Sequence, residues 1–171
     1  MASKTLHTFQ DLLAHELRDL YSAEQQIVKA LPAMIKSCSS EKLQAALQEH
    51  LEVTERQVER LEQVCEKLEI TPKGVKCAAM EGLLEEGKEI LKQKGKAPDA
   101  VLDAAIISAA QRVEHYEIAG YGTVATFAKM LGHEDAAELL AETLDEERSA
   151  DTSLTELAES EINVEAVDSE S

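Results

Sequence analysis

Residues 13–31 read LAHELRDLYSAEQQIVKAL, and their apolar side chains recur every three or four residues, as on one face of an α-helix. The row consists of Leu13, Leu17, Leu20, Glu24, Ile27 and Leu31. Glu24 is a carboxylate at a position where the periodicity requires leucine. A carboxylate inside a helical bundle is costly unless a cation or a shared proton compensates it. The stretch therefore predicts a buried helix that carries a functional acid.

Acidic residues interrupt the apolar rows of two later segments in the same way. The row over residues 113–131 contains Glu117, and the row over residues 140–158 contains Glu147 and Asp151. Four-helix bundles build metal sites from carboxylates that face inward on neighbouring helices. The three rows together predict a metal-binding bundle.

The composition favours an all-α protein with one domain. The chain has 171 residues, which is long enough for one domain with a sizeable core. It contains only 7 Gly and 3 Pro, too few for the many turns of a β fold, and it is rich in Ala, Leu, Glu, Lys and Gln, which favour helices.

The charge of the chain excludes two classes of partner. The net charge is −17, and a field of that sign repels nucleic-acid backbones and anionic membranes. No apolar run is long enough to cross a bilayer, and no signal segment begins the chain. The three cysteines lack metal-ligand spacing and are odd in number, so we interpret them as reduced thiols of a cytoplasmic protein.

Capping and turn residues divide the chain into helices. We expect long helices at about 5–37, 41–71, 99–131 and 134–159, and a short helix at 75–91. The second helix has an apolar row of Leu43, Leu47, Leu51, Thr54, Val58, Leu61, Cys65 and Leu68. Two tight hairpins joined by a long crossover make a ferritin-like four-helix bundle over residues 1–159. The acidic segment 160–171 has no helical stripe and is predicted to be disordered.

The two hairpins match internally. Glu24 and Thr54 are 30 residues apart, as are Glu117 and Glu147, and each pair straddles a hairpin turn almost symmetrically. These acids should therefore meet in one layer of the bundle. The candidate ligands of one or two divalent ions are Glu24, His50, Glu114, Glu117, Glu147 and Asp151. The alternative is a polar network whose carboxylates share protons without an ion.

Five segments carry a resemblance to a known family. They are LYSAEQQI at 20–27, HLEVT at 50–54, KCAAMEGLLEEG at 76–87, QRVEHYEIAGYGT at 111–123 and LLAETLDEERSAD at 139–151. Over residues 5–159 the chain resembles the YciE/YciF family of bacterial ferritin-like stress-response proteins. The resemblance implies a cytoplasmic homodimer of four-helix bundles that is related to rubrerythrin-like proteins and induced under stress.

The match to the ligand pattern of di-iron ferritin-like proteins is partial. Thr54 and Gln57 stand where the second helix of that pattern carries Glu and His, and Ala150 stands where the fourth helix carries His. A site rich in oxygen and poor in histidine favours hard ions such as Mn²⁺ or Mg²⁺ and also permits Fe²⁺. We expect Fe or Mn in a mononuclear or dinuclear site.

Two functions remain open at this stage. The first is a metal-dependent protein of stress defence, which oxidises bound iron or consumes an oxidant. The second is a non-catalytic dimeric bundle that acts through protein partners and has no functional metal centre. The inward-facing carboxylates favour the first function, and the absence of Glu at Thr54 and of His at Ala150 favours the second.

Overall fold

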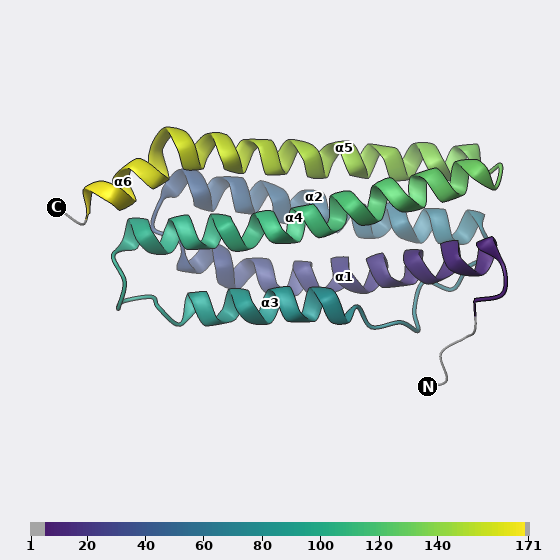
Figure 1. The fold of residues 1–171 in the computed structure, drawn as a ribbon, viewed down its shortest axis with the longest axis horizontal. Helices are drawn as coiled ribbons and strands as arrows, with labels where there is room; N and C mark the ends of the chain where they lie inside the picture. The colour runs from purple at the N-terminus through teal and green to yellow at the C-terminus, as the bar shows by residue number, and fades with distance from the viewer. Residues whose placement is uncertain (1–5, 170–171) are drawn as a thin grey trace.

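The computed structural model describes residues 6–169, and every regular element in that range is a helix (Figure 1). The elements are α1 (Phe9–Ser37), α2 (Glu41–Lys67), α3 (Ala78–Leu91), α4 (Asp99–Met130), α5 (Glu134–Leu157), the π-helical turn η1 (Ala158–Ile162) and α6 (Asn163–Asp168). The prediction of an all-α bundle is confirmed. Among the described helices, none has the length and apolar character that crossing a bilayer demands.

Side chains at the helix ends explain where the first two long helices begin. Thr8 caps α1 by accepting from the backbone amide of Asp11, and the Asp11 carboxylate accepts from the amide of Thr8 in return. The predicted start at Thr5 lies outside the described residues. Ser40 caps α2 by accepting from the amide of Leu43 at 3.3 Å, as its sequence position predicts.

The four long helices form two antiparallel hairpins, α1 with α2 and α4 with α5 (Figure 1). The crossover between the hairpins contains α3, which packs against α1 and α4 along the length of the bundle. This crossover lets α4 start at the same end as α2, so α2 and α4 run in the same direction. A bundle with one long crossover has ferritin-like connectivity, as predicted.

Asp103, near the start of α4, joins the second hairpin to the turn of the first. Its buried carboxylate accepts from the amide of Ser40 at 2.7 Å and from the amide of Ser39 at 2.9 Å. Both amides belong to the short connection between α1 and α2, where backbone donors have no helical partner. A residue of one hairpin thus completes the turn of the other.

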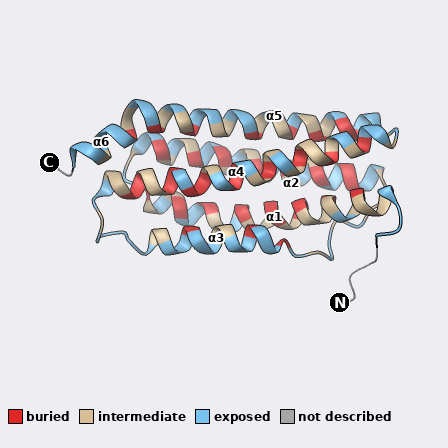
Figure 2. Cartoon of the chain, viewed as in Figure 1, coloured by how far each residue is buried: buried red, intermediate tan, exposed pale blue. Residues whose placement is uncertain are grey.

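Buried residues line the inner faces of the long helices from one end of the bundle to the other (Figure 2), and the apolar ones form two clusters. On α1 one cluster covers residues 13–21 and the other begins at Ala23. On α4 the cluster that begins at Ala23 ends at Val113, and the cluster that contains residues 13–21 begins at Tyr121. Between the clusters lies a layer of buried polar side chains, and this layer positions the candidate site.

The C-terminal segment differs from its prediction as a disordered tail from residue 160. The chain continues as η1 and α6 up to Asp168, and Ile162 is fully buried in the apolar core. Leu154, Ala158 and Ile162 are all buried and lie four residues apart, so the apolar row of α5 extends past the expected boundary at residue 159. Residues 170–171 lie outside the described part of the chain.

Candidate metal centre

Four side chains from three helices meet in the polar layer. Ligand atoms of His50, Glu114, Glu117 and Glu147 all lie within 4.8 Å of one another. His50 comes from α2, Glu114 and Glu117 come from α4, and Glu147 comes from α5. Glu114 and Glu117 are three residues apart, so they share one face of α4. The structure therefore brings together four of the six predicted ligands.

Glu24 of α1 faces the same cluster. Its carboxylate accepts a hydrogen bond from the hydroxyl of Tyr121, and the buried carboxyl groups of Glu117 and Glu147 lie nearby. Complete burial and the nearby charge of Glu147 raise the pKa of Glu24 from 4.5 to about 8, although the hydrogen bond from Tyr121 works in the opposite direction. The four long helices thus each contribute at least one side chain to the layer.

Burial controls the protonation of the other groups. It raises the pKa values of Glu114 and Glu117 well above 4.5, and the neighbouring carboxylates raise them further. It lowers the pKa of His50 below 6.5 against the opposing charge of Glu147. A neutral imidazole is the form of histidine that binds metal ions.

Several polar atoms of the layer have no hydrogen-bond partner. These atoms are one carboxylate oxygen each of Glu24, Glu114 and Glu147, both oxygens of Glu117, Nε2 of His50 and Oε1 of Gln57. The Nε2 atom of His50 lies 3.2 Å from Oε1 of Glu114, but the pair does not have the geometry of a hydrogen bond. A buried polar atom without a partner costs about 1–3 kcal/mol. A group of this many unpartnered polar atoms in one layer fits a site that is completed by cations.

A second set of side chains holds Glu147 in position. Gln57 of α2 donates its amide to Glu147 and also to Glu146, at 3.1 Å in the second case. Arg60 in turn donates to both oxygens of Glu146, at 2.7 and 3.0 Å. Partners of this kind fix the orientation of metal-binding carboxylates. The sequence pattern identifies Gln57 only as a departure, although a glutamine three residues after the buried Thr54 indicates an inward-facing amide.

The predicted register of α2 changes in its middle. The buried residues there are His50, Thr54 and Gln57, while Leu51 and Val58 of the predicted row are only half-buried. The hydroxyl of Thr54 donates to the backbone carbonyl of His50 at 2.8 Å, so Thr54 offers the site no proton of its own. Polar side chains occupy the seam here because they face the acids of α4 and α5.

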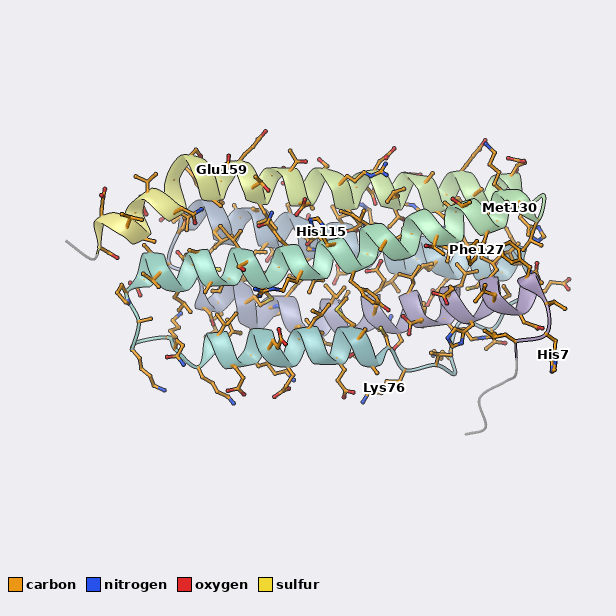
Figure 3. All side chains as sticks on the ribbon, viewed as in Figure 1. His7, Lys76, His115, Phe127, Met130 and Glu159 are labelled. Atoms are coloured by element: carbon orange, nitrogen blue, oxygen red, sulfur yellow. The ribbon has the colours of Figure 1, made fainter. Side chains whose placement is uncertain are left out.

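Asp151 does not join the cluster. Its carboxylate accepts from the amide of Gln111 at 3.0 Å and lies 3.2 Å from Nε2 of His115. His115 is an exposed residue of α4 (Figure 3). One turn beyond Glu147, the α5 backbone directs the Asp151 side chain toward the outer edge of α4. Two buried tyrosines differ in their relation to the site: Tyr121 donates to Glu24, whereas Tyr21 donates to Glu62 away from the site.

Comparison with known proteins agrees with this architecture. A model of a domain of unknown function, DUF892, matches residues 8–167. Protein YciF of Escherichia coli K12 is 48% identical over 162 residues, which cover 94% of this chain and 96% of YciF. This chain belongs to the DUF892 family. The resemblance to YciF noted from the five sequence segments is therefore confirmed.

Solved structures show the same bundle in two relatives of this DUF892 protein. The crystal structure of the E. coli stress protein YciF has a TM-score of 0.88 and covers 92% of this chain and 98% of YciF. YcfI of Rhodopseudomonas palustris is 48% identical and has a TM-score of 0.84, with 91% and 98% of the two chains covered. The fold of the family is thus shared over nearly the whole chain.

Proposed function

We propose that this protein is a stress-response protein whose polar layer binds one or two divalent metal ions, Fe or Mn. The observation that carries the proposal is the group of unpartnered oxygens on Glu24, Glu114, Glu117 and Glu147 around the Nε2 atom of His50. The relationship to the E. coli stress protein YciF supports the stress role.

The donor set indicates which ions fit. When ionised, the four carboxylates carry four negative charges, which two divalent cations would balance. A donor set of carboxylate oxygens with a single imidazole suits Fe²⁺ and Mn²⁺, whereas structural Zn²⁺ sites are rich in cysteine thiolates. The three cysteines are buried but free, and none of them belongs to the described cluster.

Each side chain has a separate task in this proposal. Glu114, Glu117, Glu147 and His50 would hold the ions, with Glu24 beside them. Gln57 orients Glu147 and Tyr121 orients Glu24, so neither carboxylate has to be ordered when an ion arrives. Bound Fe or Mn would supply the capacity to exchange single electrons with an oxidant. The apolar clusters on both sides exclude bulk water from the layer.

Metal content tests the proposal directly. The protein is purified without chelator and its metals are measured by elemental mass spectrometry, before and after anaerobic loading with Fe²⁺ or Mn²⁺. We expect one to two equivalents in the wild type, a clear loss in Glu117→Gln, and no change in Glu138→Gln, which alters an exposed carboxylate of α5. If the wild type binds no metal under any of these conditions, the proposal fails and the protein-partner function takes its place.

A further inference from the structure

We infer that a groove between α2 and α5 is the route by which divalent cations reach the polar layer. The groove has a cavity volume of about 190 Å³, and Ala46, Val53, Ala150 and Ser153 are among the residues that line it. The inference rests on the metal binding proposed above, and it assigns a role to a surface outside the ligand set.

The groove ends at a side chain of the cluster itself. His50 lines the groove and also supplies one of the four clustered ligand atoms. Its exposed fraction is 7%, against 1% or less for Glu114, Glu117 and Glu147. The imidazole is therefore the member of the cluster that an ion in the groove meets first.

The opposite approach to His50 is closed. A cavity of only about 10 Å³ lies there, and its walls are mostly apolar, with Ile27, Leu31, Met34 and Val113 among them. A volume of that size is at the lower limit for a single water molecule. Leu84 of α3 also lines this cavity, because α3 covers the α1–α4 side of the bundle. A larger cavity of about 130 Å³ adjoins it between α1, α3 and α4, but Lys29 and Lys88 line that cavity and no acidic residue does, so it suits a cation less well.

The charge of the groove suits a cation. The carboxylates of Glu49 and Glu146 both line it. Glu146 is paired with Arg60, so its charge is largely balanced, but Glu49 is exposed and appears in no ion pair within the described residues. Clefts lined by one sign of charge concentrate ions of the opposite sign, and the net charge of −17 adds to this attraction.

Small side chains keep the groove open. Ala46 faces it from α2, and Ser149 and Ala150 face it from α5. Ala150 is the position where the ferritin-like ligand pattern would carry histidine, and any larger side chain there would occupy part of the cavity. The departure from the pattern thus leaves space beside His50.

Uptake kinetics test this role. We would mix metal-free protein with Co²⁺ in a stopped-flow instrument and follow the visible absorption that appears when protein ligands replace water. The double variant Ala46→Leu/Ala150→Leu should fill the groove and slow uptake several-fold, while the final stoichiometry is unchanged. The matched control Ala45→Leu changes an exposed neighbour on the same helix and should leave the rate unchanged.

A second variant preserves the shape of the groove. Glu49→Gln should slow uptake at low ionic strength, and this difference from the wild type should shrink as salt is added. Uptake by both variants at the wild-type rate, with the helical circular dichroism intact, would overturn the access route and leave the proposed metal site standing. A wild type that binds neither Co²⁺ nor Fe or Mn would overturn both.

Discussion

Three carboxyl groups in the polar layer hold their protons more tightly than a solvated carboxyl does. Glu24, Glu114 and Glu117 all have raised pKa values because burial penalises their charged forms. In the proposed metal site, protons and metal ions therefore compete for the same oxygens, since a carboxylate must lose its proton to bind a cation. The stability of the protein should depend on pH in opposite ways with and without metal.

For the metal-free protein we expect the melting temperature to fall as the pH rises from about 5 to about 8. Folding raises the pKa of Glu24 from 4.5 to about 8, so in this window the folded chain retains a proton that the unfolded chain has lost. The free energy of unfolding therefore decreases as the pH rises through this window. The contribution of the Glu24 proton to stability is fully present only below the unfolded pKa of 4.5. Thermal melts across this range provide the measurement.

The variant Glu24→Gln separates the pH dependence that is due to the Glu24 proton from the pH dependence that is due to repulsion among the many other carboxylates. It should flatten the pH dependence of the melting temperature, and Glu138→Gln should leave the slope as it is. Saturating metal should raise the melting temperature most at the alkaline end. An identical slope in Glu24→Gln and the wild type would contradict the assignment of the proton to this carboxyl.

At the scale of the helix, α4 packs against α1 at a glycine that leaves no room for a side chain. A Cβ atom added to Gly120 would lie 2.7 Å from Cδ2 of Leu20, whose side chain is buried in the core. A Cβ atom added to Gly122, two residues later, would meet only Cδ2 of Leu144 at 3.9 Å, an ordinary van der Waals contact. The two glycines share a helix interior but differ in their surroundings.

We expect Gly122→Ala to raise the free energy of unfolding by about 0.5–1 kcal/mol, because alanine favours helix and meets no obstacle there. Gly120→Ala should be less stable than Gly122→Ala by about 1 kcal/mol or more, because Leu20 has to move within a packed core. Urea unfolding of the two variants measures this difference. Equal stabilisation by both would show that the α1–α4 contact is loose.

The helix scale also shows what could be predicted from sequence. Glu24, Glu117 and Glu147 could be placed because each interrupts an apolar row, and a row fixes which face is inside. The burial of His50 and Gln57 is harder to predict, because Leu51 and Val58 form an equally regular row along α2. Only the acids that face α2 decide which of the two rows lies inside. The burial of Ile162 is not predicted because it is a single apolar residue among acidic neighbours, although it continues the four-residue spacing of Leu154 and Ala158.

At the scale of the molecule, the two hairpins depend on each other at the polar layer and at Asp103. Asp103 accepts two backbone amides from the turn between α1 and α2 and is almost completely buried. Neither amide has a helical partner of its own. The homodimer implied by the resemblance stays a prediction, as do the binding of a metal and its identity.

We expect Asp103→Asn to lower the free energy of unfolding by roughly 1.5–3 kcal/mol, because it replaces a charged acceptor by an amide that can accept through one oxygen only. The control Asp99→Asn changes an exposed residue in the first turn of α4 and should cost less than about 1 kcal/mol. Chemical denaturation measures both values. Equal losses in the two variants would mean that Asp103 contributes no more than an exposed acid does.

The tyrosines of this chain give it an optical property. The chain has no Trp and three Tyr, and each of these phenols donates to a carboxylate: Tyr21 to Glu62, Tyr116 to Asp19 and Tyr121 to Glu24. Only the last pair lies in the polar layer. Near-ultraviolet circular dichroism reports fixed aromatic packing. An ion that binds the carboxylate of Glu24 would perturb one of the three tyrosines, Tyr121. The near-ultraviolet spectrum of the unlabelled protein should therefore report the fraction of sites that hold an ion.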